Sequence, residues 1–106
     1  MSITSEQYLA LSAVCYTNFD ASIIEELSKS GVTINYLIGS GKIPDYKDDS
    51  TNIINSKYQH LASLGGWKLI NFQPNTTSDF AAAAFQNHDT KEIVFAFRGT
   101  EPNKSA

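Results

Sequence analysis

The chain has 106 residues, of which 42% are hydrophobic and 11% aromatic, enough to build one small core. Its formal net charge is −3 and its eight basic residues are scattered, which argues against a nucleic-acid partner because phosphate binding needs a basic surface. The single cysteine, Cys15, excludes an internal disulfide. We expect one unit, residues 1–106, mainly helical over 1–65 and made of β-strands over 66–106.

The sequence shows no segment that targets or crosses a membrane. The longest apolar runs, such as Phe80 to Phe85, are six residues long, too short for a transmembrane helix. The N-terminal stretch MSITSEQYLALSAV lacks the basic leader and small-residue cleavage site of a signal peptide. We therefore expect the protein to be cytoplasmic, or secreted without a recognisable signal peptide.

The first predicted element is a helix over Glu6 to Tyr16. Thr4 and Gln7 have the spacing of a capping box, in which each side chain bonds the other residue's backbone N–H. Apolar residues then recur at helical spacing and predict the buried face. They are Tyr8, Leu11, Val14 and Cys15.

A second helix is predicted over Ala21 to Ser30, capped by Asn18 or Asp20 and ended by Gly31. Its inward residues are expected to be Ile23, Ile24 and Leu27. Because the connection between the two helices is short, we expect them to pack against each other.

The middle of the chain is less regular. Residues 32–38 favour a strand at their β-branched start and a helical turn at their end, and the pattern does not decide between them. Residues 39–49, GSGKIPDYKDD, have the composition of a mobile surface loop. Apolar spacing then predicts a third helix from about Thr51 to Leu64, capped by Ser50 and ended by Gly65-Gly66.

From Trp67 the apolar period changes to that of strands. Trp67 to Gln73 alternates as a strand does, and 74–78 is a turn. Phe80 to Gln86 and Ile93 to Phe97 then form a hairpin through the polar connection 87–90. The alanines of the first hairpin strand allow a neighbouring layer to approach closely.

The strand Ile93 to Phe97 is apolar on both faces and leads into Arg98-Gly99-Thr100. Apolar residues on both faces favour a sheet covered by helices on both sides, whose ligands bind beyond the carboxyl ends of the strands. Gly99 permits a sharp turn there, and Thr100 offers an N–H and a hydroxyl to an anionic oxygen. Arg98, with its five fixed donors, is expected to support the loop through hydrogen bonds.

The segment Asp79 to Pro102, DFAAAAFQNHDTKEIVFAFRGTEP, resembles the hairpin before the oxyanion loop in class 3, fungal-lipase-like lipases and related bacterial phospholipases. These proteins of the α/β-hydrolase fold carry an aromatic strand with small residues, a short polar turn and a hydrophobic strand that ends in F-R-G-[TS]. The match covers about a quarter of the chain. The resemblance implies an α/β fold that looks α+β in this N-terminal segment, and an oxyanion-hole role for Thr100.

The resemblance also implies acyl-ester hydrolysis of a lipid or phospholipid by the full-length protein, with no cofactor and no metal. In the family the nucleophile lies downstream in a G-x-S-x-G motif, which this sequence does not contain. We therefore expect the 106-residue chain alone to be inactive. The alternative is a stand-alone α+β protein-interaction or regulatory module without catalysis.

If the chain is such a segment, its sheet is incomplete. The strand Ile93 to Phe97 should then show an open edge or an uncovered face, and exposed edges recruit partners. We expect self-association through the hairpin 79–97.

Three other patterns are weaker. Cys15 with His60 or His88 is not expected to form a thiol nucleophile and base, because Cys15 falls on the apolar face of the first helix. The acidic loop 45–49 fails the calcium-loop template, because Lys47 occupies a ligand position. Gly39-Ser40-Gly41-Lys42 lacks the first glycine and the Ser/Thr of a P-loop.

Overall fold

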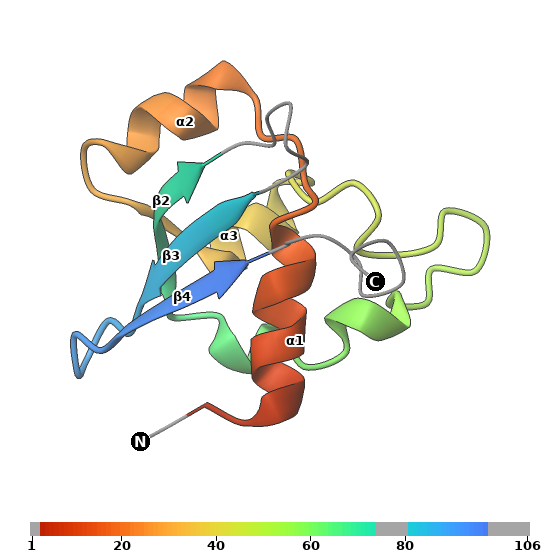
Figure 1. The fold of residues 1–106 in the computed structure, drawn as a ribbon. Coiled ribbons are helices and arrows are strands. Elements are labelled where there is room, and N and C mark those ends of the chain that lie inside the picture. The colour runs from red at the N-terminus through yellow and green to blue at the C-terminus, as the bar shows by residue number, and fades with distance from the viewer. Residues whose placement is uncertain (1–2, 74–80, 98–106) are drawn as a thin grey trace, which may run out of the picture.

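The computed structural model describes residues 3–73 and 81–97. They form a small α+β domain with a four-stranded antiparallel sheet in the order β1-β2-β3-β4 (Figure 1). The elements in chain order are α1 (Ser5–Val14), α2 (Ala21–Leu27), β1 (Val32–Thr33), α3 (Ile34–Gly39), the 3₁₀ turns η1 (Ser56–Tyr58) and η2 (Ala62–Leu64), β2 (Lys68–Gln73), β3 (Ala82–Gln86) and β4 (Ile93–Phe97). Over the described ranges, no helix has the length and apolar character that crossing a membrane requires.

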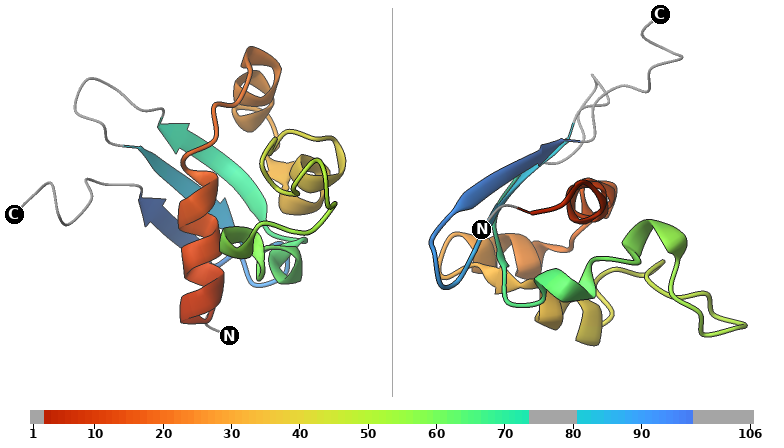
Figure 2. Two further views of the ribbon diagram at one scale, coloured as in Figure 1. Left: turned by 90° about the vertical axis from the view of Figure 1, so that its right-hand side faces the viewer. Right: turned by 90° about the horizontal axis from the view of Figure 1, so that it is seen from below.

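The helical elements and the sheet enclose one core. Figure 2 shows α1 and the 3₁₀ turns on one side of the sheet, and α1 packs against both η1 and β4. The fully buried side chains come from α1, α3, the turns and the inner face of the sheet. The largest of them are Tyr58, Phe85, Leu11, Ile34, Leu37, Leu61 and Leu69.

The prediction of the first helix is confirmed, including its cap. Thr4 Oγ1 accepts the Gln7 N–H at 3.1 Å, while Gln7 Oε1 accepts the Thr4 N–H at 2.9 Å. This capping box satisfies two backbone donors that a helix start leaves unpaired. Of the predicted inward residues, Leu11, Val14 and Cys15 are buried, and Tyr8 is half-buried.

The second helix is shorter than predicted and packs elsewhere. Asp20 is its N-cap and accepts the Ile23 N–H at 3.1 Å. Hydrogen bonds from the Ser22 hydroxyl, Lys42 and this N–H hold the pKa of Asp20 well below its usual range.

The second helix packs against the sheet. Ile23 is buried, but Ile24 is exposed, because α2 lies over β1 and β2 rather than against α1. The prediction that the two helices pack together was therefore wrong.

Gly31 ends the second helical segment with a φ of +78°, as the sequence predicted. A side chain is doubly unfavourable here, because an added Cβ would also lie 3.0 Å from the carbonyl oxygen of Leu69. We expect Gly31→Ala to lower the free energy of unfolding by about 1–2 kcal/mol. Gly39→Ala is the matched control, since a Cβ there meets no atom within 4 Å and alanine favours a helix. Urea denaturation would contradict this account if the two variants were equally stable.

Residues 32–38 form both of the structures that the sequence left open. Val32 and Thr33 pair with β2, and Thr33 then caps α3 by accepting the Tyr36 N–H at 3.1 Å. The following loop is not wholly at the surface as predicted, because Ile43 and Tyr46 are buried in the core.

The third predicted helix, Thr51 to Leu64, was wrong. A tight turn comes first, in which Asp48 Oδ1 accepts the N–H groups of Ser50 and Thr51 and Asn52 has a φ of 61°. A hydrogen bond from the Ser50 hydroxyl, together with these two N–H groups, lowers the pKa of Asp48 to about 2. Only the short turns η1 and η2 follow. The local side-chain bonds compete successfully with helix formation.

The β3–β4 hairpin has the predicted second strand and connection, whereas its first strand begins at Ala82 and the predicted start, Phe80, lies outside the described residues. Gln86 lies opposite Ile93, and the Asn87 N–H donates to the carbonyl of Glu92 at 2.8 Å. Asn87 Oδ1 accepts two N–H groups within the turn, and Lys91 closes it with a φ of 65°. This turn fixes the register that decides which side chains of β4 face the core.

Candidate functional site

The residues singled out from the sequence, Arg98, Gly99 and Thr100, lie outside the described residues. The structure describes the strand immediately before them. That strand, β4, is part of the sheet, pairs with β3 over its full length and ends at Phe97.

β4 is the last strand of the sheet, so one of its edges pairs with no other strand among residues 3–73 and 81–97. Its burial alternates strictly: Ala96 is fully buried and Val94 half-buried, whereas Ile93 is 46% exposed and Phe95 60%. Among residues 3–73 and 81–97, the cover expected over both faces is thus present over one face only. An open edge and an uncovered face are what the sequence predicted for an incomplete sheet.

The inner face of β4 is held closely by α1. The Cys15 sulfur lies 3.5 Å from the carbonyl oxygen of Ala96 and 3.8 Å from that of Leu11. The small side chain of Ala96 lets the helix approach the strand this closely. α1 therefore fixes the position of β4 one residue before its end.

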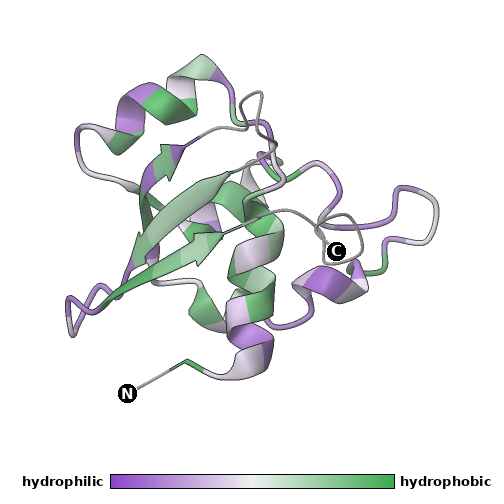
Figure 3. Cartoon of the chain, viewed as in Figure 1, coloured by the Kyte–Doolittle hydropathy of each residue, from purple (hydrophilic) through white to green (hydrophobic). Residues whose placement is uncertain are grey.

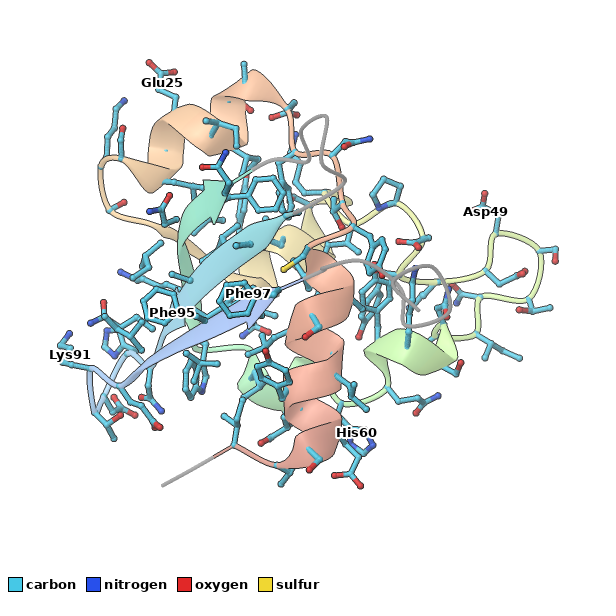
Figure 4. The ribbon with its side chains drawn as sticks, viewed as in Figure 1. Glu25, Asp49, His60, Lys91, Phe95 and Phe97 are labelled. Carbon is cyan, nitrogen blue, oxygen red and sulfur yellow. The ribbon has the colours of Figure 1, made fainter. Side chains whose placement is uncertain are left out.

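The outer face of the sheet is apolar near β4 and polar near β2. Phe95 stands opposite Ala84, and Phe97, which is 48% exposed, stands opposite Ala82. On β2 the corresponding residues are Asn71 and Gln73. A shallow hollow of about 160 Å³ lies between Phe95, the alanines and this part of β2. Figure 4 shows Phe95 and Phe97 along β4, and Figure 3 shows both hairpin strands as hydrophobic beside a hydrophilic turn.

We call Ile93, Phe95 and Phe97 the β4 patch. Polar groups of the hairpin turn bound it at one end, where Lys91 lies at the tip of the hairpin (Figure 4). His88 Nδ1 and the Asp89 carboxylate are 3.2 Å apart in the same turn, and both side chains are exposed. The patch is thus apolar along β4 and is bounded by polar side chains at its hairpin end.

The structure does not favour cysteine-based chemistry. Cys15 is buried in the core, as predicted for a small hydrophobic side chain, whereas His60 and His88 are exposed. Within the described part of the chain, no group of three or more His, Cys, Asp or Glu side chains is placed to hold a metal ion. Lys42 in the glycine-containing loop forms an ion pair with Asp20 at 3.0 Å.

Sequence analysis missed one polar cluster, which lies where the 45–58 segment packs under α1. The Tyr58 hydroxyl donates to Asp45 Oδ1 at 3.0 Å, and Lys57 Nζ lies 2.7 Å from Asp45 Oδ2. Burial and the bond to Asp45 raise the pKa of Tyr58 well above its usual value. Burial opposes the charge of Asp45, but the bonds from Lys57 and Tyr58 outweigh it and lower its pKa. We assign the cluster a structural role, because it fastens the segment to the core.

Comparison with known proteins gives no relative: no family model, curated protein or solved structure matches this chain.

Proposed function

We propose that this chain is the N-terminal segment of a lipase-like serine hydrolase that cleaves lipid or phospholipid acyl esters. The observation that carries the proposal is the β3–β4 hairpin, whose last strand ends directly before Arg98-Gly99-Thr100. The sequence resemblance concerns this same hairpin, whose strands β3 and β4 pair antiparallel in the structure.

The open edge and the exposed outer face of β4 support the proposal. A strand with three large apolar residues on its outer face costs free energy when that face meets water. In an α/β-hydrolase, further strands would pair with the open edge of β4 and helices would cover the outer face. The sheet thus has both the edge and the face that additional chain would complete.

The proposed chemistry follows from the resemblance. A serine hydroxyl in a G-x-S-x-G motif attacks the ester carbonyl while a histidine takes its proton, and an acidic residue orients the histidine. The carbonyl oxygen becomes an anion, and the N–H and hydroxyl of Thr100 stabilise it. The histidine then protonates the leaving alcohol, and water releases the acid by the same steps. α1 contributes by holding β4, and so the start of the loop, against the core.

A second candidate function is a protein-interaction or regulatory module without catalysis. The specific observation in its favour is that α1, the 3₁₀ turns and the inner face of the sheet already form a continuous core. Such a module would use the β4 patch to bind its partner.

Expression of the protein encoded by the complete gene distinguishes the two proposals. We expect it to continue beyond Ala106 into a G-x-S-x-G motif and to hydrolyse short-chain nitrophenyl esters, whereas the 106-residue chain releases no nitrophenol above the buffer rate. We expect the 106-residue chain to be inactive because it lacks the G-x-S-x-G serine, and the nucleophile and base supply most of the rate enhancement. A gene that stops at Ala106 would favour the interaction module.

A further inference from the structure

A small pocket opens where the residues after α1, the loop after α3 and η1 meet. Its volume is about 230 Å³, below the roughly 300–1,000 Å³ of a pocket for a drug-sized ligand. Its lining residues are Tyr16, Thr17, Asn18, Pro44, Asp45 and Tyr58. Thr17 and Tyr58 are buried and form its base, whereas Asn18, Pro44 and Asp45 are exposed and form its sides. The pocket therefore suits a compact ligand that reaches two buried side chains with hydroxyl groups.

The hydroxyl of Thr17 is buried without compensation. Thr17 is 7% exposed, and its Oγ1 has no hydrogen-bond partner among the residues that the structure describes. Burial and the bond to Asp45 raise the pKa of Tyr58, and the nearby Thr17 hydroxyl opposes this rise, but its contact with Tyr58 lacks the geometry of a hydrogen bond. An unsatisfied buried hydroxyl costs free energy, so a ligand that bonds to Thr17 recovers that free energy on binding.

The charges beside the pocket favour a neutral ligand. Asp45 Oδ1 accepts the Tyr58 O–H at 3.0 Å, and Asp45 Oδ2 lies 2.7 Å from Lys57 Nζ. Because Lys57 balances the carboxylate, an added cation would meet the ammonium group and an added anion would meet the carboxylate. Each carboxylate oxygen can accept a further hydrogen bond, and so can the Tyr58 oxygen. These acceptors suit uncharged donor groups.

We propose that this pocket binds a small neutral polyhydroxy compound, such as a single sugar ring. Hydroxyl groups of the ligand donate to Asp45 and to the Tyr58 oxygen, and another bonds to Thr17 Oγ1, which both donates and accepts. The Asn18 amide offers a further donor and acceptor, and the C–H groups of the ring pack against Pro44. The Asp45–Tyr58 bond thus serves recognition in addition to its structural role.

Amide NMR of the 106-residue chain tests the proposal, with methyl α-glucoside as the added sugar. We expect the amide signals of Thr17, Asn18 and Asp45 to shift progressively, with a dissociation constant in the millimolar range because few atoms make contact. Protonated glucosamine and glucuronate have the same ring with a positive or a negative charge. Each should bind severalfold more weakly in buffer of the same ionic strength.

Thr17→Val should weaken the binding of methyl α-glucoside about tenfold, because it removes the hydroxyl and keeps the shape of the side chain. Its urea midpoint should be unchanged or higher, since the variant removes an unsatisfied buried group. Thr33→Val is the matched control. Thr33 Oγ1 caps α3 by accepting the Tyr36 N–H, so this variant should lower the urea midpoint and leave sugar binding unchanged.

The absence of localised shifts at tens of millimolar methyl α-glucoside would overturn the proposal. So would equal binding of either charged sugar, or a Thr17→Val variant that binds as tightly as the original chain. A fall in the urea midpoint of Thr17→Val as large as that of Thr33→Val would show that the Thr17 hydroxyl is already satisfied, which also contradicts it. The readouts are binding and stability, so the outcome is independent of whether the longer protein hydrolyses esters.

Discussion

Replacing Thr100 with valine in the protein encoded by the complete gene is expected to lower kcat for ester hydrolysis by about 10- to 1,000-fold. Valine has the shape of threonine but lacks the hydroxyl, so the backbone N–H remains as the only donor of this residue. An oxyanion donor acts mainly in the transition state, so KM should change much less than kcat.

Thr100→Ser is the matched control, because it keeps the hydroxyl and removes only a methyl group. We expect it to retain most of the activity. If valine and serine at this position gave equal kcat values in folded protein, the hydroxyl of Thr100 would have no part in the reaction. The proposed oxyanion role would then be limited to its N–H.

Phe85→Ala should lower the free energy of unfolding by about 3–5 kcal/mol. Phe85 is 0% exposed on the inner face of β3, where it stands opposite Leu69 on one side and Val94 on the other. Truncation removes the buried ring and leaves a cavity that the rigid sheet closes only in part. Since a domain of this size is stable by about 5–15 kcal/mol, the variant should be close to unfolding at physiological temperature.

Phe95→Ala is the control for this effect. The same residue type occurs in the neighbouring pair of the sheet but is 60% exposed, so its loss should cost less than about 1 kcal/mol. Urea denaturation at low protein concentration measures both values. Equal losses for the two variants would show that the two faces of the sheet are not buried as described.

Features set by local chemistry were predictable from the sequence. The capping box of Thr4 and Gln7, the left-handed Gly31 and the β3–β4 hairpin each depend on a few neighbouring residues. The sequence was misleading over Thr51 to Leu64, where Tyr58, Leu61 and Leu64 are buried at spacings that also suit a helix. There Asp48 bonds to the backbone ahead of it and holds the chain in a turn.

Features set by long-range packing were not predictable. Ile24 reads as an inward residue of α2, but it becomes exposed because α2 lies across β1 and β2. The apolar residues on the outer face of β4 predict that another element packs on this face, but the sequence pattern does not identify that element. The strand before the candidate site was recognisable from the sequence, whereas Arg98, Gly99 and Thr100 lie outside the described residues.

The central claim is that β4 leads into the oxyanion loop of a serine hydrolase. Its most direct test is to treat the protein encoded by the complete gene with a fluorophosphonate probe, which reacts preferentially with activated serines, and to locate the adduct by mass spectrometry. We expect a single adduct, on the serine of a G-x-S-x-G motif that follows Ala106 in the longer chain. A folded protein in which no serine reacts would contradict the claim.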